Sequence, residues 1–528
     1  MENKKINYLF PLALAGTLIL GLFIGQKLMV AAPETELISQ GGSDYRKMQD
    51  IIKILDNRYV DSVNANALFE EAIGDMLHKL DPHSSYISAK DLLAANEQIQ
   101  GEFAGVGVRF FIIRDTVCIT NVIENSPSSR AGLLAGDKIV KVDKEEITKS
   151  KIENDQVMSL LKGPIGSEVK VTVLRNGKKL TKSVIRGAIP INSINTAYML
   201  NDKTGFIKID QFSLTTTTEF KNAARRLLNQ GMKQLVLDLR NNGGGVLSSA
   251  TQIADEFLRT NKVIVSTKGI HSDERKYMST NVGMLENMKV AVLINENSAS
   301  ASEILAGALQ DHDRATIIGR RSFGKGLVQE DVELRDGSNL RLTIARYYTP
   351  TGRCIQKEYN GNIEEYYHEQ SDRYQNGELY APDSSLFVDS LKFVTKGGKT
   401  VYGGGGIMPD KFVPLDTVGN TWYLTQLRYS SAFQSFAFDY VQTRRSQWKS
   451  IDHFVKSFQV SDELLKQFTN YGKKYFQIAF NNKEFLQSKS LMKELLKGEI
   501  ARQIWTENGY FQVINQKDKE IKEALRQF

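Results

Sequence analysis

The feature that most constrains the fold is an apolar run over 234–239 that leads into a glycine-rich turn and then a helical pattern over 246–258. A strand that is apolar on both faces is typical of a parallel sheet covered on both sides. The same order of strand and helix recurs over 289–319. Repeated strand–helix crossovers of this kind predict an α/β core with a parallel sheet.

Composition narrows the class of protein around that core. The chain has 528 residues, so several domains are expected rather than one hydrophobic core. The net charge is +7 at pH 7, yet charges of both signs are interleaved without a long basic run, which argues against a nucleic-acid partner. Cys118 and Cys354 do not stand in a metal-ligand spacing, and the six histidines are scattered. We therefore expect neither a disulfide framework nor a metal site.

The first thirty residues differ from the rest. Lys4 and Lys5 precede a mostly apolar run over 6–26, and the small residue Ala32 follows. This pattern predicts a signal peptide or a membrane anchor over 1–32, followed by a polar linker over 33–43. By the positive-inside rule, the remainder of the chain would lie outside the cytoplasmic membrane, in a periplasm or anchored and facing it.

The next region, 44–100, has apolar positions at helical spacing and is predicted to be helical. The turn Asp81-Pro82-His83 interrupts it. A histidine in a turn is tempting as a catalytic base, but we interpret His83 as a structural hydrogen-bonding residue.

Residues 101–188 change to strand patterns with the spacing Ser-Pro, Ala-Gly-Leu and Gly-Asp-Lys-Ile over 126–139, and they resemble a PDZ domain. PDZ domains bind a peptide by strand addition and hold its terminal carboxylate on backbone N–H groups. The resemblance implies that the carboxylate loop comprises Gly105, Val106, Gly107 and Val108. The alternative is that these glycines only relieve a twisted strand.

The candidate nucleophile is Ser300, which lies where the predicted strand over 289–295 gives way to a helix. The free N–H groups of a first helical turn point at such a junction, so the N–H of Ala301 could stabilise an oxyanion. The loop after the strand over 234–239 would supply a second donor from Gly243 or Gly244. The alternative role for Ser298, Ser300 and Ser302 is helix capping, and local physics does not choose among the three.

A serine nucleophile needs a base, and the candidate is Lys325, between Gly324 and Gly326. Burial beside apolar neighbours would lower the pKa of its amine toward the range of a general base. Gln329 follows four residues later and could orient the amine. The sequence over 319–325 also matches the start of a phosphate-binding loop. However, Gly326 stands where that loop needs Ser or Thr and a strand pattern follows, so nucleotide binding is rejected.

Several motifs together resemble the carboxy-terminal-processing, or tail-specific, serine proteases of peptidase family S41. They are Leu80-Asp81-Pro82-His83-Ser84, Asp238-Leu239-Arg240-Asn241-Asn242-Gly243-Gly244, Ser298-Ala299-Ser300-Ala301-Ser302-Glu303, Gly324-Lys325-Gly326-Leu327-Val328-Gln329, Tyr348-Thr349-Pro350-Thr351-Gly352 and Gly406-Ile407-Met408-Pro409-Asp410. The resemblance implies a Ser300–Lys325 catalytic pair assisted by Gln329, a ClpP/crotonase-like core over 189–415 and no cofactor. It also implies cleavage of exported proteins near their C-termini. The family often carries proline where Asn242 stands, which leaves the rigidity of this loop open.

Two regions lie outside the resemblance. Residues 357–402 are polar and are interpreted as an insertion in the core. Residues 416–528 are charged, aromatic and helix-patterned, and they are interpreted as an interaction or oligomerisation region, for copies of the chain or a regulatory protein. The predicted architecture is thus a multidomain α/β protein with an inserted PDZ domain and helical terminal regions. Its substrate would be a protein or peptide with a disordered C-terminus. The competing function is a catalytically silent PDZ scaffold that binds C-termini.

Overall fold

The computed structural model describes residues 43–148, 152–280, 283–382 and 388–528. The predicted signal peptide or anchor over 1–32 and the linker over 33–43, apart from Ser43, lie outside the described residues. Within the described ranges, no helix has the length and hydrophobicity to cross a membrane. The described residues fall into two units, one that ends at Met76 and one that runs from Leu77 to Phe528. The first unit contains α2 (Ser43–Arg58) and most of α3 (Ala65–His78).

The second unit begins with the end of α3, a short strand and a helix. These are β1 (Ser85–Ile87) and α4 (Ala89–Gln100), so the region over 44–100 is largely helical, as predicted, with one added strand. Ser88 caps α4 by accepting a hydrogen bond from the N–H of Asp91, and Gly101 ends it in the left-handed conformation.

A β-rich domain with a small apolar core follows. Its main sheet has the strand order β3-β4-β5-β7-β8, and β2 pairs with β9 separately. The elements are β2 (Glu102–Gly105), β3 (Val108–Ile113), β4 (Thr116–Val122), α5 (Pro127–Arg130), β5 (Lys138–Val142), β6 (Glu145–Glu146), α6 (Asn154–Leu161), β7 (Glu168–Arg175), β8 (Lys178–Ile185) and β9 (Gly187–Pro190). Asn176 and Gly177 have positive φ angles and form the tight turn between β7 and β8 that the Asn-Gly pair predicts.

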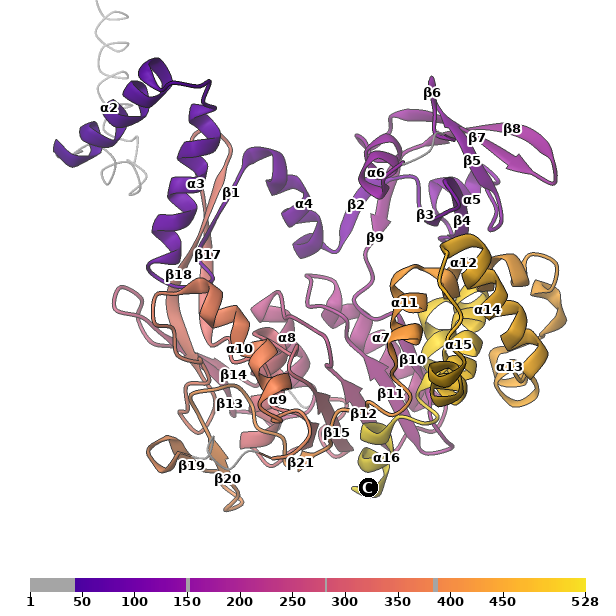
Figure 1. Ribbon diagram of the computed structural model, residues 1–528. Helices are drawn as coiled ribbons and strands as arrows, with labels where there is room; N and C mark the ends of the chain where they lie inside the picture. Colours follow the sequence, from indigo (N-terminus) through magenta and orange to yellow (C-terminus); the bar gives the residue numbers. More distant parts are fainter. Residues whose placement is uncertain (1–42, 149–151, 281–282, 383–387) are drawn as a thin grey trace, which may run out of the picture. The chain divides into compact units, whose positions relative to one another are not determined.

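The core domain is organised by a six-stranded sheet of order β10-β11-β12-β15-β16-β21, parallel except where β10 pairs with β11 (Figure 1). Its elements are β10 (Thr196–Met199), β11 (Thr204–Lys208), α7 (Thr216–Asn229), β12 (Gln234–Asp238), α8 (Leu247–Asp255), β15 (Lys289–Ile294), α9 (Ala301–Asp311), β16 (Thr316–Gly319) and β21 (Lys411–Phe412). Leu235, Leu237 and Val292 pack with α7, α8 and α9, while Val236 and Leu293 pack on the opposite face. The predicted parallel sheet covered on both faces is confirmed.

A second sheet lies beside this core and contains the strand that follows the loop with Lys325. Its strands are β13 (Val263–Lys268), β14 (Arg275–Met278), β17 (Leu327–Glu333) and β18 (Asn339–Tyr348), joined by β1. Residues 357–402 contain α10 (Ile363–Gln375), a 3₁₀ turn (Asp389–Leu391) and a hairpin of β19 (Lys392–Val394) with β20 (Thr400–Tyr402).

The C-terminal region is helical and has its own core of aromatic and aliphatic side chains. Its helices are α11 (Trp422–Tyr429), α12 (Ala432–Val441), α13 (Ile451–Ser457), α14 (Asp462–Phe476), α15 (Asn482–Ile514) and α16 (Lys519–Arg526), with a 3₁₀ turn over Arg445–Gln447. Ser461 caps α14, as its sequence predicts. Ile521 and Ala524 of α16 cover the sheet face opposite to α7–α9.

Candidate active site

The candidate catalytic segments leave three consecutive parallel strands. β15 lies between β12 and β16, and the chain leaves their carboxyl ends toward Gly243, Ser300 and Lys325, respectively. Open α/β sheets bind their ligands outside the carboxyl ends of the strands. The topology therefore brings together three loops that are far apart in sequence.

The three serines of the 298–302 turn have different environments. The Ser298 hydroxyl donates to the carbonyl of Leu239 at 2.9 Å, and the Ser302 hydroxyl donates to that of Asn242 at 2.9 Å. Both serines are fully buried and tie the turn to the loop after β12. Ser300 instead lines a cavity of about 510 Å³ together with Lys325, Gln329 and Gly243. Of the three serines, Ser300 is thus the one that lines this cavity, whereas the hydroxyls of the other two are bound to backbone carbonyls.

The backbone of Ser300 is strained. It has φ 54° and ψ −114°, a region that side-chain-bearing residues rarely adopt and that costs on the order of 1–3 kcal/mol. This conformation turns the chain sharply into α9. The N–H of Ala301 lies at the helix start and, among the described residues, has no hydrogen-bond acceptor.

The two glycines of the loop after β12 that were expected to donate to an oxyanion, Gly243 and Gly244, differ in their contacts. The N–H of Gly244 donates to Asn242 Oδ1 at 2.9 Å, which corrects its expected role as an oxyanion donor. Gly244 has φ 102°, and a Cβ there would lie 2.7 Å from Ser300 Cβ, so glycine is needed for close approach. Gly243 is exposed to the cavity, and its N–H has no acceptor within the described part of the chain.

Asn242 ties this loop to the structure around it. Its side chain is fully buried, donates to the Ile209 carbonyl at 2.9 Å and accepts from Gly244. Its carbonyl accepts from the N–H of Ala299 at 3.0 Å. The loop after β12 is thereby fixed to both the sheet and the serine turn.

The Lys325 amine donates to Gln329 Oε1 at 2.9 Å, which is the contact predicted from their spacing. Burial lowers the pKa of Lys325, and the positive charge of Arg341 lowers it further. Both effects favour the neutral amine, the form in which lysine can accept a proton. Tyr347 places its hydroxyl between the carbonyls of Ser300 and Lys325, 3.1 Å from the former.

Gln329 is oriented by the turn that contains His83. The Gln329 amide donates to the carbonyl of His83. Asp81 fixes this turn because its Oδ1 accepts from the N–H groups of His83 and Ser84, each at 2.8 Å. The His83 ring contacts the Tyr366 hydroxyl at 3.0 Å, and burial lowers the pKa of His83 to about 3, helped by the charge of Lys325. His83 therefore acts as the structural residue that its turn predicts.

Glu303 joins the nucleophile turn to the base loop, a role that the sequence interpretation missed. Its Oε2 accepts from the N–H groups of Ser300 at 2.8 Å and Lys325 at 2.9 Å. Its Oε1 accepts from the Ser322 hydroxyl at 2.5 Å and the Gly324 N–H at 2.7 Å. Glu303 is fully buried, and burial raises its pKa to about 7 against the opposing effect of these bonds. The spacing of Ser300 and Glu303, which is that of a capping box, was the available signal.

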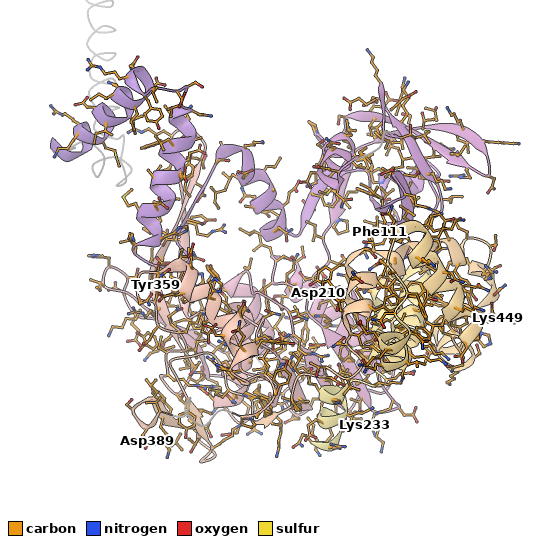
Figure 2. The ribbon with its side chains drawn as sticks, viewed as in Figure 1. Phe111, Asp210, Lys233, Tyr359, Asp389 and Lys449 are labelled. Atoms are coloured by element: carbon orange, nitrogen blue, oxygen red, sulfur yellow. The ribbon has the colours of Figure 1, made fainter. Side chains whose placement is uncertain are left out.

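The insertion over 357–402 supports the base loop. Arg373 of α10 is fully buried and donates to the carbonyls of Ser322 at 2.8 Å and Phe323 at 3.2 Å. Further back in the same segment, Tyr359 (Figure 2) donates to the carbonyl of His78. Nothing in the sequence pattern connected this polar segment with Lys325.

The candidate carboxylate loop of the β-rich domain also has free donors. Within the described residues, the N–H groups of Val106 and Gly107 have no hydrogen-bond acceptor. Gly107 has φ 82°, and a Cβ there would lie 2.4 Å from Ser126 Cβ. The Gly107 carbonyl accepts from the N–H of Ile123 at 3.0 Å, so this loop is fixed from behind. Gly105 and Val108 flank it as the end of β2 and the start of β3.

Comparisons with known proteins agree with this architecture. The sequence profile of peptidase family S41 matches residues 203–365, and a PDZ-domain profile matches residues 104–185. A profile described as the N-terminal domain of the activating protease CtpB matches residues 26–91. Residues 423–506 match a family of unknown function.

Two curated relatives and one solved structure illustrate what the chain is similar to. A probable CtpA-like serine protease of Staphylococcus haemolyticus (strain JCSC1435) is 32% identical over 401 residues, which are 74% of this chain and 79% of that protein. A carboxy-terminal-processing protease of Bartonella bacilliformis is 35% identical over 348 residues, 64% of this chain and 79% of that protein. The structure of a photosystem II D1 C-terminal processing protease is 28% identical, with 60% and 90% of the two chains covered and a TM-score of 0.33. The chain belongs to peptidase family S41, the serine endopeptidases that process protein C-termini.

Proposed function

We propose that Ser300 is the nucleophile and Lys325 the general base of this endopeptidase. The observation that carries the proposal is the shared cavity: Ser300 lines it with Lys325, whereas the hydroxyls of Ser298 and Ser302 are bound to backbone carbonyls. The lowered pKa of Lys325 and its bond to Gln329 support the role of the amine as base. These features favour a working protease over a catalytically silent PDZ scaffold.

The reaction follows from these positions. The neutral Lys325 amine takes the proton of the Ser300 hydroxyl as its oxygen attacks the carbonyl carbon of the scissile bond. The resulting oxyanion accepts hydrogen bonds from the N–H groups of Ala301 and Gly243, and each such donor is typically worth about 100–1000-fold in rate. The Lys325 ammonium then protonates the departing amine, which leaves an ester on Ser300. Lys325 next takes a proton from the water molecule that attacks the ester carbon. As the bond to Ser300 Oγ breaks and the shortened protein leaves, the Lys325 ammonium returns that proton to the Ser300 oxygen.

The cavity favours an apolar residue beside the scissile bond. Beside Lys325 and the charged residues Glu330, Asp331 and Arg341, its lining has an aliphatic part formed by Ile99, Val246, Leu247, Ile304, Leu327 and Val328. Filling such a pocket with an aliphatic side chain gains roughly 1.5–3 kcal/mol. We therefore propose substrates whose disordered C-terminal tails carry apolar residues.

The PDZ domain would capture that tail. The free N–H groups of Val106 and Gly107 support a carboxylate site at this loop. Capture raises the concentration of the tail near the cavity, so loss of the PDZ site should raise KM more than it lowers kcat.

We also propose that the protein acts outside the cytoplasmic membrane and that it binds a partner other than its substrate. Lys4, Lys5 and the apolar run over 6–26 support export across the cytoplasmic membrane, with membrane association if the segment is retained. Trp422 and Tyr429 have 68% and 88% of their surface exposed, which supports a partner, another copy or a regulatory protein, on the C-terminal region.

The test is cleavage of a folded protein that carries an unstructured apolar tail. Mass spectrometry of the products should show wild type shortening the tail, while Ser300→Ala and Lys325→Ala leave it intact. Wild type that binds the tail without ever cutting it would favour the scaffold instead. Cell fractionation with the 1–32 segment present or deleted tests export, because only the full chain should leave the cytoplasm.

A further inference from the structure

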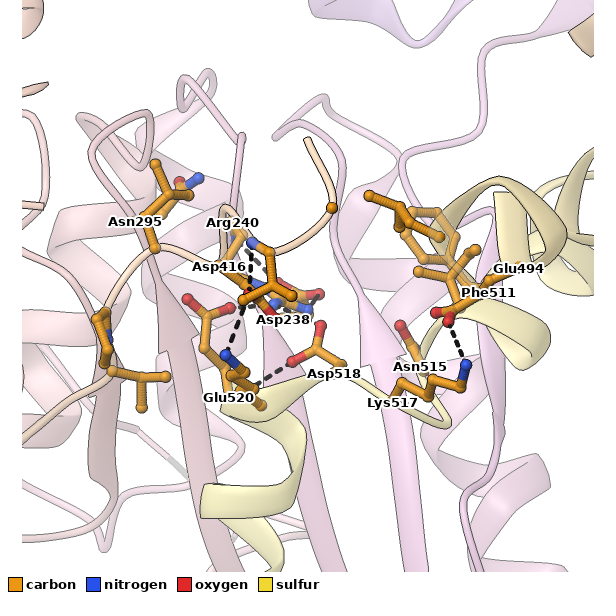
Figure 3. A pocket seen from close by; sticks show the side chains of 18 of the residues that line it. Asp238, Arg240, Asn295, Asp416, Glu494, Phe511, Asn515, Lys517, Asp518 and Glu520 are labelled. Atoms are coloured by element: carbon orange, nitrogen blue, oxygen red, sulfur yellow. Dashed lines mark hydrogen bonds and ion pairs between the residues drawn. The ribbon is translucent and has the colours of Figure 1, made fainter. Parts of the chain in front are cut away.

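A buried network of charges lies where the C-terminal segment meets the carboxyl ends of the core strands. It borders a cavity of about 500 Å³ that is lined by both regions. Figure 3 shows Arg240 among the carboxylates of Asp238, Asp518 and Glu520. Charges this deeply placed are expensive unless they are paired, so their arrangement is narrowly specified.

Glu520, at the start of α16, contacts two arginines at once. Its Oε1 lies 2.5 Å from Arg320 Nη1, and its Oε2 binds Arg240 Nη1. The side chains are 8%, 7% and 13% exposed for Glu520, Arg320 and Arg240, respectively. The two ion pairs are therefore little screened by solvent.

The two arginines lie near the starts of the two loops that contain Gly243 and Lys325. Arg240 lies two residues after the end of β12 and precedes the oxyanion donor Gly243 by three residues. Arg320 directly follows β16 and precedes Lys325 by five residues. Because β15 lies between β12 and β16, the Glu520 carboxylate bridges across the strand that leads to Ser300.

The network also reaches the middle strand. Arg320 Nε lies 2.9 Å from Glu296, which follows β15. Arg240 Nη2 forms an ion pair at 2.7 Å with Asp238, the last residue of β12. With both arginines anchored to the sheet, a carboxylate supplied by the C-terminal segment fixes the distance between the two loops.

We infer that Glu520 is a positioning residue for catalysis. From the C-terminal segment it fixes the position of the loop over 240–243, which carries the oxyanion donor, relative to the loop over 320–325, which carries the base. It touches neither substrate nor the reacting atoms. The inference rests on the roles proposed for Gly243 and Lys325. A small misplacement of catalytic groups can cost about 100-fold in rate, so loss of the bridge should act on kcat.

The test compares Glu520→Gln with the matched control Glu494→Gln. Glu494 lines the same cavity and pairs with Lys517 at 2.9 Å (Figure 3), but it contacts neither arginine. Glu520→Gln should lower kcat about 10- to 100-fold with KM little changed, whereas Glu494→Gln should leave both near wild type. Equal kcat values in the two folded variants would overturn the inference.

A second readout does not depend on cleavage. Hydrogen exchange should accelerate at the backbone amides of 240–243 and 320–325 in Glu520→Gln, and it should stay unchanged there in Glu494→Gln. Unchanged exchange at both loops in Glu520→Gln would refute the bridge. Failure of the wild type to cleave any tail would instead refute the proposed function, and exchange would still test the bridge.

A milder variant covers the case in which Glu520→Gln does not fold. Asp518 pairs with Arg240 through Oδ2 at 2.8 Å, while its Oδ1 caps α16 by accepting from the N–H of Glu520 at 2.8 Å. Asp518→Asn keeps a capping oxygen and removes one carboxylate from Arg240. It should loosen exchange at 240–243 but not at 320–325. Identical exchange to wild type at 240–243 would contradict the inference.

Discussion

The Glu303 carboxylate offers the sharpest test of how the nucleophile and base are held together. Four donors converge on it, from Ser300, Ser322, Gly324 and Lys325, at 2.5–2.9 Å. A glutamine can accept at only one end. It should direct its amide nitrogen toward the Ser322 hydroxyl, which can turn and accept, and keep its oxygen toward Ser300 and Lys325.

The expected cost follows from the donors left without a partner. In Glu303→Gln only the Gly324 N–H is orphaned, at about 1–3 kcal/mol. If that free energy were lost wholly from the transition state, kcat/KM would fall by roughly 5- to 150-fold, since 1.36 kcal/mol is tenfold. Glu303→Ala orphans three backbone N–H groups, about 3–9 kcal/mol, which is comparable to the whole stability of a domain. We expect Glu303→Gln to fold and Glu303→Ala to fold poorly.

The pH dependence of Glu303→Gln separates this account from a general loss of fold. Burial raises the pKa of Glu303 to about 7, so below pH 7 the wild type increasingly carries a neutral carboxyl group that resembles the glutamine. The ratio of wild-type to variant kcat/KM should therefore shrink as pH falls from 8 to 6. Thermal unfolding monitors the folded fraction. A folded Glu303→Gln with wild-type kcat/KM at pH 8 would refute the reasoning.

Three further perturbations test separate parts of the site. Arg341→Gln removes a positive charge that lowers the pKa of Lys325, so the pKa of Lys325 should rise in this variant. Because less neutral amine is then present at pH 8, the rising limb of the pH–rate profile should move to higher pH. An unmoved limb would contradict this. Asn242→Ala orphans two buried partners at about 1–3 kcal/mol each and should lower both thermal stability and kcat, and an unchanged melting temperature would count against the loop's assigned rigidity. Gly107→Ala places alanine in a left-handed backbone conformation, which costs roughly 1–2 kcal/mol in addition to the clash with Ser126. The variant should raise KM for substrates with a C-terminal tail without changing kcat. An equal effect on a peptide without a tail would refute tail capture.

The strands could be predicted because their signals are local, whereas the choice of Ser300 as candidate nucleophile came from the family resemblance. The apolar run before Arg240 and the strand before Ser300 have the composition of buried parallel strands, and both strands are present. The four-residue spacing of Lys325 and Gln329 anticipated their hydrogen bond, although Lys325 lies in the loop before β17 and Gln329 lies within that strand, not on a helix.

The remaining features depend on contacts between distant segments. Gly244 was expected to donate to an oxyanion, but its N–H donates to the Asn242 side chain instead, a contact that composition does not indicate. Arg373 supports the base loop from fifty residues away, and Glu520 reaches Arg320 across two hundred residues. Glu303 was not predicted as a site residue, because a buried carboxylate shared by two loops has no periodic signature.

The central claim is that Ser300 and Lys325 form a working pair, and removing the base while keeping the nucleophile tests it most directly. The rate of tail shortening by Lys325→Ala, with Ser300 intact, should be measured by mass spectrometry against wild type at pH 8. The Lys325→Ala variant should fold and still bind the tail, but it should not shorten the tail measurably. Cleavage by Lys325→Ala at the wild-type rate would contradict the assignment.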